Sequence, residues 1–189
     1  MKKLVKATGK DKKNSTLIVP VRKHATDLII GVEDEWKALV ARDRLVFDGY
    51  KLYWQGAQSS IYSAFSGPAD ESERESKKDT GPTPQGLFTV NPANVEELEP
   101  TDDWGKYRVI LEPLRSTVTR MASCFPAIRT QMYIHGGSAV GTHGCIELNN
   151  DDEEAKFFGR LKTYGRPLEL EVKYVGEREQ KYEESQCPY

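Results

Sequence analysis

The stretch MYIHGGSAVGTHGCIELNN, residues 132–150, is the segment on which the interpretation of the whole chain depends. The apolar residues before His135 predict a strand, and the glycines that follow predict a tight loop. Two of the chain's three histidines, His135 and His143, and one of its three cysteines, Cys145, fall in this short segment. Three interpretations compete: a cysteine nucleophile with a histidine base, a zinc site, or a glycine-rich turn without chemistry.

A cysteine nucleophile needs a base that takes its proton, donors for the developing oxyanion, and open space in front of the sulfur. Cys145 follows Gly144, whose missing side chain leaves the approach open. His135, at the end of the predicted strand, can meet the cysteine across the loop and act as its general base. His143, two residues before Cys145, is better placed to shape the turn or the oxyanion pocket.

The zinc alternative uses the same side chains. His135, His143 and Cys145 can supply three ligands, with water as the fourth. The sequence contains no CxxC or HExxH spacing, so this alternative ranks below the thiol interpretation. The turn without chemistry ranks equally low, because reactive residue types cluster here. We therefore expect no metal at this site.

The rest of the chain predicts a mostly β (α+β) protein with one or two short helices, since short apolar segments alternate with turns. Alternating residues flank Asp48-Gly49, a dipeptide typical of a type I′ hairpin turn. A helix is predicted to begin near Asn149 or Asn150 and to end at Gly165, with acidic residues in its first turn.

The length of 189 residues suits one domain with a small appendage. We expect residues 46–175 to form that domain. Residues 1–45 are expected as a partly structured N-terminal segment with a basic start and a short helix at 33–43, and residues 176–189 as a polar C-terminal tail.

Composition and targeting patterns narrow the possible partners and compartments. The net charge of −2 argues against nucleic acid as the principal partner. No segment approaches the ~18 apolar residues of a membrane span, and no secretory signal follows the basic start. We expect the chain to be made in the cytoplasm and to leave only through signal-independent export. Cys124 and Cys187 are expected as lone thiols, with a pair formed after export as the alternative.

The block Thr142-His143-Gly144-Cys145-Ile146, with His135-Gly136 upstream and Asn149 downstream, resembles the active-site signature of YkuD-type L,D-transpeptidases. Over residues 50–150, the order LYWQG, AFSG, GPTPQGLFTV, YIHGG and THGCIEL is similar to the L,D-transpeptidase-like effectors of type VI secretion, antibacterial toxins that attack peptidoglycan. One position departs from this pattern: Glu147 stands where many members have arginine. Its carboxylate is either a solvated loop charge or a functional group.

The resemblance implies a fold and a set of roles. The fold would be an L,D-transpeptidase-like β-sandwich or β-rich domain. Cys145 would be the nucleophile, His135 its general base and His143 the second active-site histidine. The backbone around Gly144 and Cys145 would form the oxyanion hole, in the turn that Thr142 begins, and the carbonyl of Gly136 would orient the base.

The implied reaction is acyl transfer through a thioester on the tetrapeptide stems of peptidoglycan, with release of the terminal D-Ala and without a cofactor. Water, a D-amino acid or a stem amine would accept the acyl group. An effector would act in the periplasm of a target bacterium, with the type VI secretion apparatus and a periplasmic immunity protein as partners. The alternatives are a housekeeping L,D-transpeptidase of cell-wall remodelling and a non-catalytic module that binds stem peptides or a protein.

Overall fold

The structure, a computed structural model, describes residues 42–182 apart from residues 72 and 140. The N-terminal segment predicted at 1–45 lies almost wholly outside the described residues, as does the helix predicted at 33–43. The described strands are β1 (Arg44–Phe47), β2 (Lys51–Gln55), β3 (Ser60–Ser66), β4 (Gly86–Thr101), β5 (Gly105–Pro113), β6 (Tyr133–His135), β7 (Ile146–Leu148) and β8 (Leu168–Val172). The described helices are α2 (Arg115–Cys124), α3 (Asp151–Tyr164) and α4 (Glu177–Tyr182).

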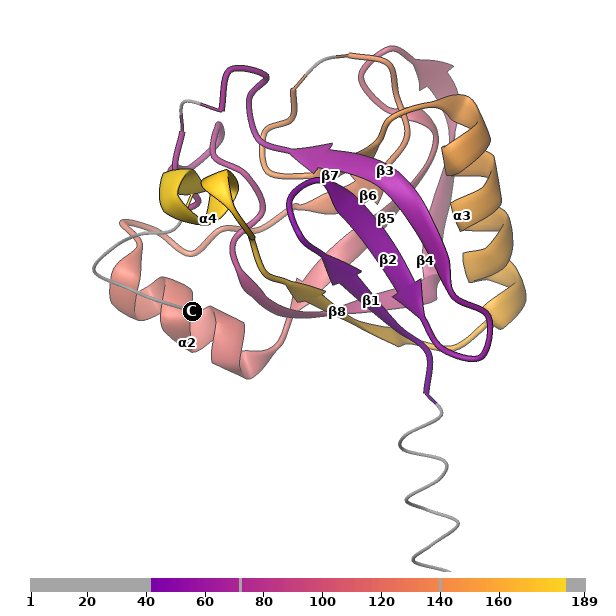
Figure 1. Ribbon diagram of the computed structural model, residues 1–189, viewed down its shortest axis with the longest axis horizontal. Helices are drawn as coiled ribbons and strands as arrows, with labels where there is room; N and C mark the ends of the chain where they lie inside the picture. Colours follow the sequence, from indigo (N-terminus) through magenta and orange to yellow (C-terminus); the bar gives the residue numbers. More distant parts are fainter. Residues whose placement is uncertain (1–41, 72, 140, 183–189) are drawn as a thin grey trace, which may run out of the picture. The chain divides into compact units, whose positions relative to one another are not determined.

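The strands form one sheet that closes into a barrel in the order β1-β2-β3-β7-β6-β5-β4-β8 (Figure 1). Most neighbours are antiparallel, but β6 pairs with β7 and β1 pairs with β8 in parallel. The mostly β prediction is confirmed. Closure removes the sheet edges, because β1 and β8 come from opposite ends of the described chain and pair with each other.

The hairpin predicted at Asp48-Gly49 joins β1 to β2. Its turn is not type I′, because Gly49 has a positive φ of 98° but Asp48 does not. Instead the Asp48 carboxylate accepts hydrogen bonds from the backbone N–H groups of Tyr50 and Lys51, at 2.8 and 2.7 Å. The side chain of Asp48 thus stabilises the turn in place of a second residue with positive φ.

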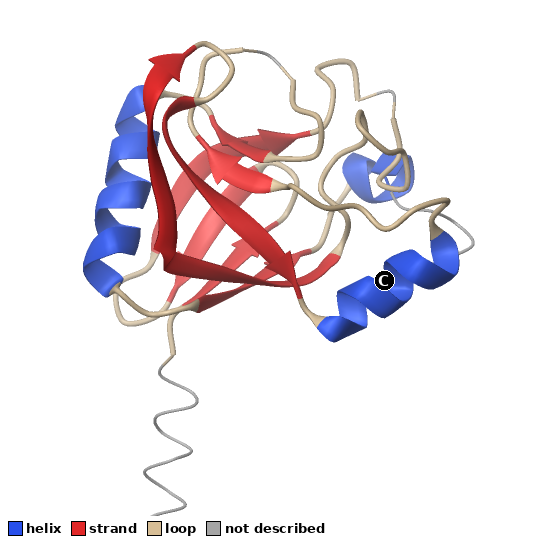
Figure 2. Ribbon diagram, turned by 180° about the vertical axis from the view of Figure 1, so that it is seen from behind, coloured by secondary structure: helices blue, strands red, loops and turns tan. Residues whose placement is uncertain are grey.

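Helix α3 has the limits that its sequence predicts. The Asn150 side chain caps it by accepting from Glu153 N at 2.9 Å, and Gly165 ends it in the left-handed conformation. The helix packs along one flank of the barrel (Figure 2). Phe157, Phe158 and Leu161 on its inner face are inaccessible to solvent.

The structure describes three helices, whereas the sequence predicted one or two. Helix α2 has no acidic residue in its first turn and no side-chain cap, so its sequence carries no local helix signal. Tertiary contacts hold it: the Thr117 hydroxyl both donates to Leu87 O and accepts from Leu87 N, at 2.7 Å each. Helix α4 lies within the segment predicted as a polar tail, and its Arg178 pairs with Glu71 at 2.8 Å.

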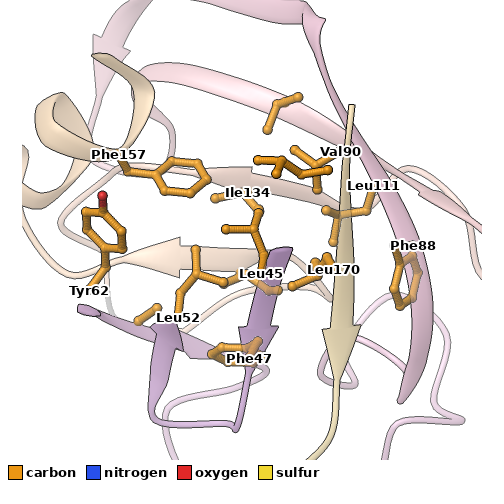
Figure 3. Close-up of a cluster of buried hydrophobic side chains, with 14 of the residues drawn as sticks. Leu45, Phe47, Leu52, Tyr62, Phe88, Val90, Leu111, Ile134, Phe157 and Leu170 are labelled. Atoms are coloured by element: carbon orange, nitrogen blue, oxygen red, sulfur yellow. The ribbon is translucent and has the colours of Figure 1, made fainter. Parts of the chain in front are cut away.

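The core fills the barrel and the space beneath α3 (Figure 3). Aromatic rings meet edge to face at the α3 side, as Trp54 and Tyr62 do with Phe157, with ring centroids 6.1 and 5.4 Å apart.

No helix in the part of the chain that the structure describes has the length and apolar character that a membrane crossing requires.

Candidate active site

The candidate catalytic residues meet where β6 and β7 run side by side. His135 is the last residue of β6, and Cys145 directly precedes β7. Because these two strands are parallel neighbours, with Ile134 opposite Ile146, Cys145 falls opposite Tyr133, two residues from His135 along the pair. Side chains two residues apart point to the same face of a sheet, so the histidine and the cysteine share one face. Both side chains line a cavity of about 260 Å³, together with Asp103, Trp104, Gly141, Thr142 and His143.

His135 is buried, with 3% of its surface exposed, and its ring has a fixed orientation. Nδ1 lies 2.5 Å from the carbonyl oxygen of Gly136. A carbonyl only accepts, so Nδ1 donates, and Nε2 is left as the ring nitrogen that can take a proton. Burial lowers the pKa of His135, so the imidazole is neutral at pH 7 and available as a base. The indole of Trp104 packs on it, with ring centroids 4.9 Å apart.

Cys145 is a free cysteine with 7% of its surface exposed. Burial raises the pKa of its thiol to about 11, although the backbone of Tyr133 and the charges of Arg129 and Arg108 lower it. The thiol is therefore protonated at neutral pH. Any nucleophilic attack by this sulfur has to be coupled to removal of its proton by a base.

Threonine hydroxyls hold the turn that presents Cys145. Thr142 Oγ1 donates to the Cys145 carbonyl at 2.8 Å and accepts from Gly67 N at 3.0 Å. Thr83, from the Gly-Pro-Thr-Pro turn, donates to the carbonyl of Gly144 at 2.9 Å. Gly144 has a φ of 106°, which residues with a side chain rarely adopt. The turn is thus fixed from two sides, by its own Thr142 and by Thr83 from upstream.

His143 is exposed and lines two cavities. One is the cavity that contains Cys145 and His135. The other, of about 250 Å³, is polar and lies between His143 and the Lys78–Asp79 and Ile128–Gln131 segments. His143 is therefore next to the candidate nucleophile, and its role as a second active-site histidine stays a prediction.

Glu147 is not a solvated loop charge. It lies on β7 with 1% of its surface exposed. It is the register partner of His135, which is itself opposite Arg108 on β5, so the three side chains share one face of the sheet. Burial, and then the charge of Asp103, raise the pKa of Glu147 to about 8, so this carboxyl is mostly neutral at pH 7. The sequence left this alternative open because a single polar position in a short strand does not reveal its burial.

Two further contributors to the site were not recognised in the sequence. Arg129 is buried beneath the Cys145 turn, and Glu154 of α3 accepts from Lys106 N and Tyr107 N, at 2.8 and 2.6 Å, beside Gly136. Neither residue belongs to a recognisable motif. The acidic first turn of α3 predicted a helix start, but it could not show that one of its carboxylates faces inward.

The metal alternative has no geometric support in the described part of the chain, where no three His, Cys, Asp or Glu side chains are grouped so that they could hold an ion. Cys124 is disulfide-bonded, so the expectation of a lone thiol at this position is wrong. Cys187, its partner in the alternative that the sequence offered, lies outside the described residues.

No family model matches the sequence, and no curated protein matches it. Among solved structures, the fold is similar to that of Bd1075 from Bdellovibrio bacteriovorus, with a TM-score of 0.48 and 15% identity over 75% of this chain and 53% of that chain. It is also similar to an L,D-transpeptidase from Xylanimonas cellulosilytica, with a TM-score of 0.42 and 16% identity over 70% of this chain and 60% of that one. The chain thus spans 53% and 60% of the lengths of these two structures.

Proposed function

We propose that the chain is a cysteine-dependent enzyme with L,D-transpeptidase and L,D-carboxypeptidase activity on the tetrapeptide stems of peptidoglycan. The observation that carries the proposal is that Cys145 and His135 line one cavity, with His135 Nδ1 bound to the Gly136 carbonyl so that Nε2 can take a proton. The substrate class comes from the sequence block around Cys145, which resembles that of L,D-transpeptidases.

In the proposed reaction, His135 Nε2 takes the thiol proton as Cys145 Sγ attacks the carbonyl carbon of the third stem residue. The C–N bond to the terminal D-Ala then breaks, the D-Ala nitrogen receives the proton from His135, and a thioester remains on Cys145. Water hydrolyses the thioester in the carboxypeptidase reaction. The amine of a D-amino acid or of a second stem forms a new amide in the transpeptidase reaction. Either acceptor restores the thiol.

We extend the proposal to an antibacterial role: a type VI secretion effector that acts in the periplasm of a target bacterium and is neutralised there by an immunity protein. The support is the order of motifs along residues 50–150, which resembles that of such effectors. A cavity that admits a peptide carbonyl also offers an inhibitory protein a place to insert a side chain.

Cys145→Ala tests the enzymatic proposal. We expect this variant to lose release of D-Ala from purified disaccharide-tetrapeptide by a factor of about 10³ or more, because the covalent step has no other nucleophile. Release is measured by mass spectrometry of the products. Thr163→Ala, at an exposed position of α3, should retain the wild-type rate and serves as the control.

Inhibitors separate the thiol mechanism from the zinc alternative. Iodoacetamide should stop release with one adduct on the Cys145 peptide, and EDTA should leave the rate unchanged.

Release of D-Ala at the wild-type rate by Cys145→Ala would refute the mechanism. Tight tetrapeptide binding without any release by the wild type would instead identify a non-catalytic binding module.

A further inference from the structure

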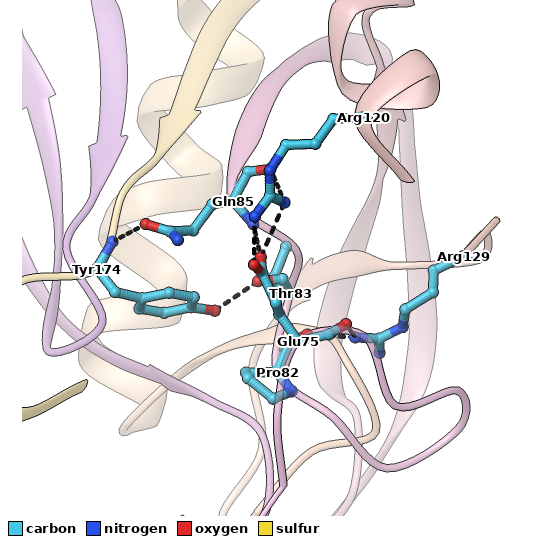
Figure 4. Close-up of polar contacts among 7 residues, drawn as sticks. All are labelled: Glu75, Pro82, Thr83, Gln85, Arg120, Arg129 and Tyr174. Atoms are coloured by element: carbon cyan, nitrogen blue, oxygen red, sulfur yellow. Dashed lines mark hydrogen bonds and ion pairs between the residues drawn. The ribbon is translucent and has the colours of Figure 1, made fainter. Parts of the chain in front are cut away.

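Arg129 lies in the segment between α2 and β6 and is buried, with 4% of its surface exposed. Among the described residues its guanidinium donates to backbone carbonyls: Nη1 to Glu75 O at 2.8 Å and to Pro82 O, and Nη2 to Gly81 O at 2.7 Å. Nη2 also reaches His143 O, at 3.4 Å, in the Cys145 turn. Figure 4 shows the arginine extending to the loop that contains Glu75 and Pro82.

The charge of Arg129 has no carboxylate in ion-pair contact among the residues that the structure describes. Arg120, in the same polar network, does pair with a carboxylate, that of Glu75, at 2.5 Å. A buried cation is ordinarily paired, because removing its hydration is costly. The positive charge of Arg129 is therefore available to an anion that forms nearby.

The guanidinium touches the backbone that precedes the candidate nucleophile. A Cβ atom built on Gly144 would lie 2.1 Å from Arg129 Nη2, so a side chain at this position would collide with Arg129 as well as strain the φ of 106°. Arg129 thus packs against Gly144, the residue before Cys145.

The same contacts orient two peptide planes. In a trans peptide the C=O and the following N–H point in opposite directions. The His143 carbonyl is directed to Arg129 and the Gly144 carbonyl to Thr83, so the N–H groups of Gly144 and Cys145 point away from these two partners. These are the N–H groups that the proposed oxyanion hole requires.

We propose that Arg129 is a positioning residue of the Cys145 site, which orients the oxyanion donors of the turn and supplies the buried positive charge that a Cys145 thiolate faces. The proposal rests on Cys145 as the reactive thiol of the proposed function. It also offers a substitute for the arginine missing at position 147, because a cation from a distant segment of the chain contacts the turn that precedes Cys145.

Other charges face the same sulfur and must be considered with it. Arg129 and Arg108 lower the pKa of the Cys145 thiol and Glu147 raises it. Asp103, His135 and His143 line the same cavity. Glu75 and Asp79 act on Arg129 from beyond ion-pair distance. Removing only the Arg129 charge leaves all of these in place, so its contribution can be measured by itself.

The test is the rate of alkylation of Cys145 by iodoacetamide from pH 7 to pH 10, followed by mass spectrometry of the Cys145 peptide and without any substrate. Arg129→Met should lower the rate at pH 8 about three- to tenfold and move the pH–rate profile to higher pH, because the thiolate loses its counter-charge. Arg129→Lys, which keeps the charge, should restore most of the rate. If Arg129→Met does not fold, Arg129→Gln provides the neutral variant.

Arg160→Met is the matched control. Arg160 is another arginine that joins distant segments, through Ser60 Oγ at 2.8 Å and the face of Trp54, and it does not line the cavity that contains Cys145. Arg160→Met should have a lower midpoint of thermal unfolding than the wild type, but the same pH–rate profile of Cys145 alkylation. Identical profiles for the wild type, the neutral Arg129 variant and Arg160→Met would overturn the proposal. Because the alkylation assay contains no substrate, that outcome would not contradict the proposed activity on peptidoglycan.

Discussion

At the scale of one residue, Glu147 shows how burial changes the pKa of a carboxyl group. Its carboxyl is buried on β7, and one of its oxygens, Oε2, has no hydrogen-bond partner among the described residues. The ionised form is disfavoured there, so the pKa rises from 4.5 to about 8. Protonation removes the charge that burial would otherwise destabilise.

This shift predicts a pH dependence of stability. Between pH 4.5 and 8 the folded state binds the Glu147 proton more tightly than the unfolded state does, so the free energy of unfolding falls as pH rises through that window. The glutamine of Glu147→Gln does not titrate in this pH range. We expect its stability relative to the wild type to increase from pH 5 to pH 9, by at least about 1.4 kcal/mol, the equivalent of one pKa unit. Urea denaturation at both pH values measures the change.

Glu112→Gln, on the exposed side of β5, controls for the loss of a surface carboxylate. A difference between Glu147→Gln and the wild type that is the same at pH 5 and pH 9 would show that Glu147 titrates normally in the folded protein.

At the scale of elements, the start of α3 holds the end of β6 in place. The Glu154 carboxylate accepts two backbone N–H groups at the start of β5 and also packs against Gly136, whose carbonyl orients His135. A Cβ on Gly136 would lie 2.1 Å from the Glu154 carboxyl carbon. The helix therefore restricts which residue can follow the candidate base.

Two glycine-to-alanine substitutions test this packing. Gly136→Ala should reduce stability by about 1–3 kcal/mol, because either Glu154 or the β6 end must move, and should also lower D-Ala release. Gly159→Ala, in α3, meets nothing within 4 Å and should raise stability by about 0.5–1 kcal/mol through helix propensity alone, with unchanged release. Thermal denaturation and the release assay give both values. If Gly136→Ala had the stability and the release rate of the wild type, Glu154 would not constrain the site.

At the scale of the whole molecule, the barrel brings three separate segments to one site. The β4–β5 turn contributes Trp104, the β6–β7 loop contributes Cys145, and the Gly-Pro-Thr-Pro segment contributes Thr83. The backbone N–H groups of Ser138 and Ala139 bind Asp102 O at 2.8 and 2.9 Å, which joins two of these segments directly. The cavity exists only in the assembled barrel.

The effector proposal predicts toxicity that depends on compartment. Mature tetrapeptide stems lie outside the cytoplasmic membrane, so the chain expressed in the bacterial cytoplasm should be nearly harmless. Fused to a cleavable signal peptide, it should cause lysis or arrested division, and Cys145→Ala should abolish the effect. Colony survival with and without the signal measures this. Equal killing from the cytoplasm by the native and Cys145→Ala forms would contradict the proposal.

The sequence by itself determined the features that neighbouring residues encode. The Asp48-Gly49 hairpin and the limits of α3 follow from turn and capping residues that act within a few positions of the chain. The catalytic candidates were identified in the same way, because His135 and Cys145 belong to one strand–loop–strand segment in which reactive residue types cluster.

The tertiary structure decided what depends on residues far apart in the chain. Closure of the barrel by β1 and β8, the formation of α2, the burial of Glu147 and the position of Arg129 behind Gly144 all arise from long-range packing. Burial is a property of everything that surrounds a side chain, and it sets whether a charge is solvated, paired or suppressed. A local pattern cannot contain that information, so the sequence shows which groups can react and the fold sets their charge.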